Sequence, residues 1–245
     1  MIVTTVVRSL SRGSLLGVAV CAGLLIAAGS ANAAPLLVEN FDDITTLPGA
    51  GWVQTNNSSP AGSTGWFQGD TASFSAQAGA ADSYIGANFN NAAFGGNVSN
   101  WLLTPTLMLD NGETLTFWSR TEAGGALFGD QLEVRMSTNG ASTNVGATDS
   151  SVGDFSALLL TINPMPESWT MFSVTLSGLG APTSGRLAFR YHVTDTSIDG
   201  DYIGIDTVAV DPAAVAAVPE PATWTMLGLG LAGLALRRRR AARRS

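Results

Sequence analysis

The chain has 245 residues, of which 45% are hydrophobic and 13% charged, and its formal net charge is −7. It contains no lysine, and between residues 34 and 217 eighteen carboxylates face only four arginines, for a net charge of −14. Such an acidic surface repels phosphate backbones, which argues against nucleic acid as a partner.

The first 33 residues have the three parts of a secretory signal peptide. Two arginines precede an apolar stretch at residues 15–28, and the small residues Ala-Asn-Ala follow at residues 31–33. This order predicts cleavage by signal peptidase between Ala33 and Ala34. The only cysteine, Cys21, lies in the apolar stretch, so the mature protein is expected to have no disulfide and no thiol.

The region after the signal peptide alternates apolar and polar residues with period two, which is typical of strands with one buried face. The clearest alternation covers residues 115–117, 132–136, 172–176 and 187–193. Weaker candidate strands cover residues 36–41, 65–68, 84–87, 98–103, 158–162 and 202–210. Gly, Asn, Asp and Ser fill the gaps between these segments, as expected for turns.

This pattern predicts an all-β fold, in which short antiparallel strands form a β-sandwich with jelly-roll connections. A β-barrel is the structural alternative. An outer-membrane barrel is disfavoured, because the segments are too short and irregular to supply an outward apolar band on every strand.

Four motifs, in their order along residues 36–211, resemble a choice-of-anchor J domain. They are LVENFD at 37–42, NWLLTP at 100–105, GDQLEV at 129–134 and YIGID at 202–206. Such domains are similar to cleaved-adhesin and MAM-like sandwiches. The resemblance implies surface display and binding, and it implies no known reaction.

The densest group of carboxylates surrounds a glycine near the end of this region, and it comprises Asp195, Asp199, Asp201 and Asp206. Calcium takes six to eight oxygen ligands, so a loop that gathers several carboxylates can hold it. The spacing differs from an EF-hand loop, which ends on a glutamate. A solvated acidic turn is the simpler explanation for Asp195 and Asp199.

Asp206 follows two isoleucines in an apolar strand, where an unpaired carboxylate is costly. In sandwiches of the resembled type a calcium ion often ties the first strand to the last. The resemblance therefore implies Glu39, Asp42 and Asp206 as calcium ligands. A salt bridge from Asp206 to one of the four arginines is the alternative.

Aromatic residues suggest a second kind of site. Trp52 and Trp66 flank a loop at residues 56–64 that is rich in Asn, Ser and Gly. We expect their indoles to be partly exposed and to stack on sugar rings, whereas most other large rings are expected in the core.

Catalytic signatures are weak in this region. The only histidine, His192, is predicted on the polar face of its strand with a structural role. The sequence lacks a Gly-x-Ser-x-Gly elbow, a His-Glu-x-x-His helix and a phosphate loop. We therefore expect no enzymatic activity. A glycosidase needs only two carboxylates, so a secreted carbohydrate-active enzyme is kept as the alternative.

The C-terminus has three parts: Val218-Pro219-Glu220-Pro221, an apolar stretch at residues 222–236, and an arginine-rich end. At about 1.5 Å per residue, a helix of this stretch reaches part-way across a bilayer core of about 30 Å. It predicts a short or tilted transmembrane helix. The arginines are expected to keep the end of the chain cytoplasmic.

This order of parts resembles the PEP-CTERM sorting signal of Gram-negative bacteria. The resemblance implies that an exosortase-type membrane protease cuts near the Pro-Glu-Pro, so that insertion into the inner membrane is transient. A permanent membrane anchor is the alternative.

Taken together, these features predict four regions. They are a signal peptide at 1–33, a β-sandwich at 34–212, a linker at 213–217 and a sorting signal at 218–245. We expect export across the inner membrane to the cell surface or the extracellular matrix. There the protein would act in adhesion or in binding extracellular polysaccharide. A self-associating structural matrix protein is a further alternative.

Overall fold

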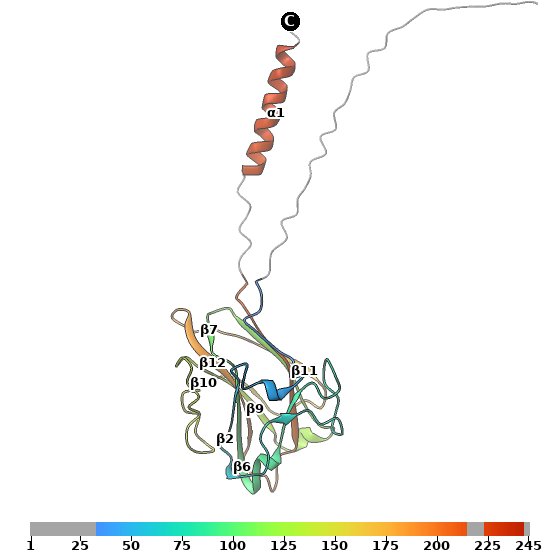
Figure 1. The fold of residues 1–245 in the computed structure, drawn as a ribbon, viewed down its shortest axis with the longest axis vertical. Coiled ribbons are helices and arrows are strands. Elements are labelled where there is room, and N and C mark those ends of the chain that lie inside the picture. The colour runs from blue at the N-terminus through green and yellow to red at the C-terminus, as the bar shows by residue number, and fades with distance from the viewer. Residues whose placement is uncertain (1–32, 215–222, 243–245) are drawn as a thin grey trace, which may run out of the picture. The chain divides into compact units, whose positions relative to one another are not determined.

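The computed structural model of the protein describes residues 33–214 and 223–242 (Figure 1). The predicted signal peptide up to residue 32 and the motif at 218–221 lie outside the described residues. Ala33 and Ala34, which flank the predicted cleavage site, are exposed. Residues 37–211 form thirteen strands in two sheets, which confirms the predicted all-β sandwich.

One sheet has six strands in the order β11-β8-β13-β5-β4, and β1 pairs with the far half of β13. Every pairing in it is antiparallel. Its strands are β1 (Leu37–Glu39), β4 (Phe67–Gln68), β5 (Ile85–Asn88), β8 (Thr114–Thr121), β11 (Thr170–Thr175) and β13 (Tyr202–Asp211).

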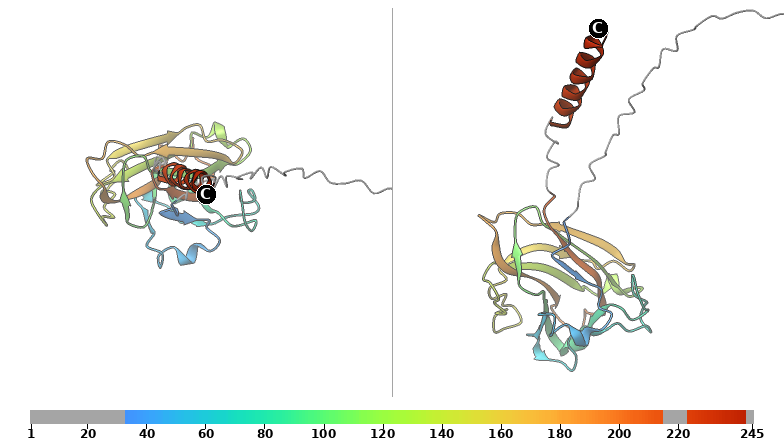
Figure 2. Two further views of the ribbon diagram at one scale, coloured as in Figure 1. Left: turned by 90° about the horizontal axis from the view of Figure 1, so that it is seen from above. Right: turned by 45° about the horizontal axis from the view of Figure 1, so that its top comes forward.

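The other sheet has seven strands in the order β10-β9-β12-β6-β2, with β3 on β6 and β7 on β12. These pairings are antiparallel too. Its strands are β2 (Val53–Asn56), β3 (Ser59–Ala61), β6 (Ala92–Leu103), β7 (Leu107–Leu109), β9 (Gln131–Ser137), β10 (Ala157–Ile162) and β12 (Thr183–Val193). Figure 2 shows both sheets from two further directions.

The main core lies between the sheets and is built by the alternation seen in the sequence. In β8, Leu115 and Phe117 are fully buried, and the neighbours on either side are half-buried. Phe117 meets Phe189 of β12 edge-on, with ring centroids 4.9 Å apart, and stacks on Phe172 of β11 at 5.5 Å. One inward face from each sheet therefore supplies the core, as expected for a sandwich.

Three short 3-10 helices interrupt the region that was predicted to be free of helix. They are η1 (Ile44–Thr46), η2 (Phe89–Asn91) and η3 (Gly125–Leu127). Each spans a single turn, and the first two are capped by the side chains of Asp43 and Asn88. Elements this short carry no periodic signal, so the sequence could not show them.

The outer face of the seven-stranded sheet carries a second, smaller core. Trp101, Leu103 and Ala188 are buried there against Val145 and Phe155 of the segment at residues 138–156. This segment, which links β9 to β10, therefore covers part of a face that would otherwise be open to solvent.

Helix α1 (Thr223–Ala241) covers residues 223–236 of the predicted apolar stretch, and its last turn carries arginines. Among the residues that the structure describes, no helix is both long and apolar enough to cross a membrane. The predicted short transmembrane helix is thus not found. Four arginines within the helix shorten its apolar part to less than a bilayer core requires.

Candidate functional site

Asp206 lies at an irregularity of β13, where the register on β8 shifts between Asp206 and Ala209. Its carboxylate is fully buried, and its Oδ2 accepts hydrogen bonds from the backbone N–H groups of Gln77 (2.8 Å) and Ala78 (3.2 Å). Thr207, which has a positive φ of 49°, donates its hydroxyl to Oδ1 at 3.1 Å. These donors satisfy the carboxylate and fix the loop after residue 76 to the sheet.

The predicted salt bridge of Asp206 is wrong. Within residues 33–214 both ion pairs involve Glu133, and the donors to Asp206 are amides and a hydroxyl. Burial raises the pKa of Asp206, and the bonds from Ala78 and Gln77 counteract that rise.

The three predicted calcium ligands do not assemble into one site. Glu39 accepts a hydrogen bond from the backbone of Phe41 at 2.8 Å, and Asp42 lies beside Gly79, in the loop that Asp206 holds. In the described part of the chain, no three Asp, Glu, His or Cys side chains gather closely enough to hold a metal ion. Backbone amides engage Oδ2 of Asp206 and the Thr207 hydroxyl engages Oδ1, so both oxygens that a cation would use already accept hydrogen bonds. Calcium binding itself stays a prediction.

The acidic turn near residue 200 divides into an exposed and a buried part. Asp195 accepts hydrogen bonds from the backbone and hydroxyl of Ser197, at 2.9 and 2.6 Å, which lower its pKa. Asp130, which lies in the motif at 129–134 but was not predicted as a site residue, is 1% exposed and accepts bonds from Tyr191 Oη and from the backbone of Asp201. Its Oδ2 has no partner, and burial raises its pKa to about 6.

The expected exposure of two tryptophans is wrong. Trp52 and Trp66 are only 3% and 5% exposed and belong to the main core. Trp52 meets the ring of Phe41 edge-on, with centroids 5.6 Å apart. Burial of the rings between the sheets leaves no open indole face for a sugar, because the polar loop between them folds back on the protein through Asn56 and Asn91.

A buried ionic network underlies the outer face of the seven-stranded sheet. Glu133 accepts from Arg135 Nε at 2.7 Å and from Arg190 Nη1 at 3.1 Å. The Arg190 guanidinium lies over the Trp101 ring, 5.2 Å from its centroid, and donates to the backbone carbonyl of Asp149. The network therefore anchors the 138–156 segment as well as neutralising a buried charge.

The same segment forms one wall of an open surface pocket of about 380 Å³. Its lining residues are Asn56, Asn57, Ser58, Ser59, Ala147, Thr148 and Asp149. Two side-chain bonds hold the walls together: Asn57 Nδ2 donates to the Gly146 carbonyl at 2.8 Å, and Asn97 Nδ2 donates to Asp149 Oδ2 at 2.7 Å. The two walls lie far apart in the sequence, so no local motif could predict the pocket.

Comparison with protein families matches residues 217–240 to the PEP-CTERM protein-sorting motif. The predicted sorting signal is confirmed, and Val218, Pro219, Glu220 and Pro221 lie within the match. The motif implies export, processing by an exosortase at the membrane and localisation at the surface. Comparison with curated proteins finds no match to the chain.

Solved structures share the fold of the sandwich. The K1 cleaved adhesin domain of Lys-gingipain from Porphyromonas gingivalis W83 is 23% identical with a TM-score of 0.51, covering 73% of this chain and 98% of that domain. The K2 cleaved adhesin domain of Lys-gingipain is 16% identical with a TM-score of 0.51, covering 72% and 99%. At these identities the likeness concerns the fold, and it confirms the predicted cleaved-adhesin type of sandwich.

Proposed function

We propose that this protein is a non-catalytic module that binds a neutral polysaccharide at the cell surface through the pocket between β2–β3 and the 138–156 segment. The observation that carries the proposal is the chemistry of the pocket walls. Amide, hydroxyl and carboxylate groups alternate there within a volume of about 380 Å³. Sugar hydroxyls both donate and accept hydrogen bonds, so such a mixed lining suits them.

The pocket favours binding over hydrolysis. Of its lining residues, Asp149 alone carries a carboxylate, and this group already accepts a bond from Asn97. Most glycoside hydrolases need a pair of carboxylates on either side of the scissile bond. A carbohydrate-active enzyme that used this pocket would lack its second acid.

The sorting motif supports the setting of this function. A protein exported across the inner membrane of a Gram-negative cell and cut by an exosortase would reach the cell surface or its polysaccharide matrix. A domain with a net charge of −14 there remains soluble and binds neutral or cationic partners more readily than anionic ones.

The test is to block the pocket without changing its charge. Ala147 is an exposed lining residue, and Ala141 is an exposed residue of the same segment that lies outside the lining. We expect neutral glucan, galactan or xylan in a native gel to retard the exported protein and its Ala141→Trp variant. Ala147→Trp should migrate as if no polysaccharide were present.

Equal retardation of both tryptophan variants would show that the pocket is not the site. If none of the three polysaccharides retards the unmodified protein, the proposal of neutral glycan binding fails. Thermal melting of both variants provides the control for folding.

A further inference from the structure

One end of the sandwich exposes large apolar side chains from three separate segments, which are η2 with the start of β6, η3 with the residue after it, and the loop at residues 195–201. Phe94, Leu127 and Ile198 are 88%, 86% and 72% exposed, and Phe89 and Phe128 are about two-fifths exposed. We call these five residues the apolar tip. Scattered single exposed apolar residues are ordinary, but several gathered at one place mark an interaction surface.

Hydrogen bonds between the loops hold the tip together. The backbone of Gly200 donates to the Phe128 carbonyl at 2.7 Å, and Phe89 donates to the Asp201 carbonyl at 3.0 Å. Gly200 also packs closely against Phe89, since a Cβ at this glycine would come within 2.9 Å of the Phe89 Cβ. Phe89 and Phe128 therefore both contact Gly200.

Further hydrogen bonds join the segment at residues 89–96 to the loop at residues 195–201. Thr196 donates its hydroxyl to the Ala93 carbonyl at 2.8 Å and accepts from the Gly96 N–H at 3.1 Å. Phe94 lies between these two anchors, and Ile198 lies two residues beyond Thr196. The exposed side chains thus come from segments that hydrogen bonds hold in place. Less conformational entropy is therefore lost when a partner binds.

Carboxylates surround the tip. Asp199 packs against Gly129 beside Phe128, and an oxygen of Asp201 lies 2.8 Å from the Cβ position of Gly125, which begins η3. Burial raises the pKa of Asp201, and the neighbouring Glu122 raises it further. Negative charges therefore repel one another at the edge of the tip.

The arginines of the sandwich are engaged elsewhere. Arg135 and Arg190 pair with Glu133, and Arg186 donates to two backbone carbonyls. Arg120 donates to the Glu167 carbonyl and lies over the Phe74 ring. The sandwich contains no lysine, so within residues 33–214 the charge beside the tip is negative.

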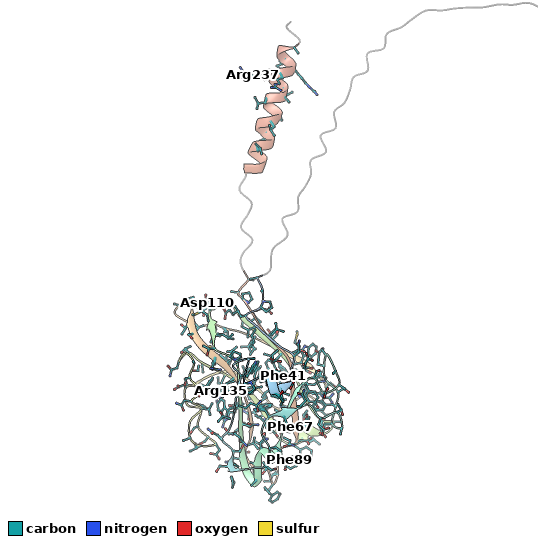
Figure 3. The ribbon with its side chains drawn as sticks, in the orientation of Figure 1. Phe41, Phe67, Phe89, Asp110, Arg135 and Arg237 are labelled. Atoms are coloured by element: carbon teal, nitrogen blue, oxygen red, sulfur yellow. The ribbon has the colours of Figure 1, made fainter. Side chains whose placement is uncertain are left out.

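The tip lies at the end of the sandwich opposite to the exit of the chain. The loop at residues 195–201 leads directly into β13, whose ten residues span about 33 Å before Asp211. In Figure 3, Phe89 and Asp110 accordingly lie at opposite ends of the sandwich. The tip thus lies at the end of the sandwich away from Asp211.

We propose that the apolar tip docks a basic protein surface that carries exposed apolar side chains. Lysine or arginine of the partner would pair with the carboxylates around the tip, while its apolar groups would cover Phe94, Leu127 and Ile198. A second copy of this chain brings the same negative charge to the contact, and an anionic lipid leaflet would be repelled. The tip is separate from the pocket proposed to bind glycans.

The experiment uses a synthetic amphipathic peptide of lysine and leucine, a lysine–serine peptide and a glutamate–leucine peptide as probes of the exported protein. We expect the lysine–leucine peptide to bind with a Kd on the order of 10 μM, and more weakly as salt is raised. The other two peptides should bind at least about tenfold more weakly, since each lacks one of the two complementary features.

A matched pair of variants locates the site. The triple variant F94S/L127S/I198S should lose at least about tenfold in affinity for the lysine–leucine peptide, a loss of about 1.4 kcal/mol. The variant M108S/L158S/M171S removes three residues that are half-exposed on strands and should bind as before. Equal melting temperatures of the two variants exclude a folding defect.

Equal binding to both variants, or equal binding of the lysine–serine peptide, would overturn the proposal. So would self-association of the exported protein, or its co-sedimentation with neutral phosphatidylcholine vesicles, if the tip substitutions abolished either one. The glycan assay is independent of these outcomes, because both of its variants lie in the 138–156 segment and neither changes the tip.

Discussion

The buried carboxyl group of Asp130 should make the stability of the folded protein depend on pH. It is buried immediately before β9, one of its oxygens accepts two hydrogen bonds, and the other oxygen has no partner. Burial raises its pKa to about 6, against about 3.9 in an unfolded chain. The folded state therefore holds this proton more tightly than the unfolded state does.

Because the folded state binds this proton more tightly, stability should fall as the pH rises. The contribution of Asp130 to stability is fully present below about pH 4, and it is lost as the pH rises through about 6. A shift of about two pKa units corresponds to about 3 kcal/mol. Between pH 4 and pH 7 this effect should lower the free energy of unfolding of the unmodified protein by about 2–3 kcal/mol. Asp130→Asn cannot ionise at this position, so urea unfolding should show no such decrease for the variant.

A matched control is Asp195→Asn. Its pKa is lowered by Ser197, so its contribution is lost only below about pH 4 and its difference from the unmodified protein should hardly change between pH 4 and pH 7. If the difference between the unmodified protein and Asp130→Asn were also independent of pH, the carboxylate would be ionised in both states and the account of its burial would be wrong.

At the scale of residues, the sequence predicted that a buried carboxylate needs a partner, but it did not predict which groups supply it. An apolar strand indicated that Asp206 requires a partner, and the structure supplies backbone amides of Gln77 and Ala78. These donors have no side-chain signature. The prediction that two tryptophans are exposed was wrong for a related reason. Flanking polar residues suggested exposure, but the rings of Trp52 and Trp66 are buried in the core.

Among the elements, the segment at residues 138–156 connects stability to the pocket. Phe155 is fully buried in it and packs on Trp101, with ring centroids 5.9 Å apart. Phe155→Ala should lower the free energy of unfolding by about 3–5 kcal/mol, measured by urea titration, because it leaves a cavity beneath the segment.

Phe94→Ala is the matched control, since Phe94 is 88% exposed and its truncation should change the free energy of unfolding by no more than about 0.5 kcal/mol. A loss below about 1 kcal/mol for Phe155→Ala would show that the segment is not part of the cooperative fold.

Strands were predictable where alternation was strong. The segments around Phe117, Val134 and Phe189 lie in β8, β9 and β12, as predicted. The sequence did not reveal β2, β3 and β7, which have four residues or fewer, and β3 contains Pro60. Such short edge strands form because longer neighbours offer them free hydrogen-bonding groups, so their signal lies in the partner strand.

At the scale of the whole molecule, the charges follow the order of the regions. A net charge of −14 in residues 34–217 is followed by six arginines after residue 236, and the overall value of −7 conceals this division. The matched sorting motif at residues 217–240 begins where the composition changes. The matched motif implies export and processing at the membrane. The segment before Ala34 stays a predicted signal peptide, and we infer that the acidic sandwich between the two carries the function.

The intact mass of the protein recovered from the host cell envelope and from the medium tests this account most directly. We predict a product that begins at Ala34 and ends within residues 219–221, which would lack every C-terminal arginine. A protein in the envelope that retains Arg244 would instead be permanently anchored, and would contradict processing at the sorting motif.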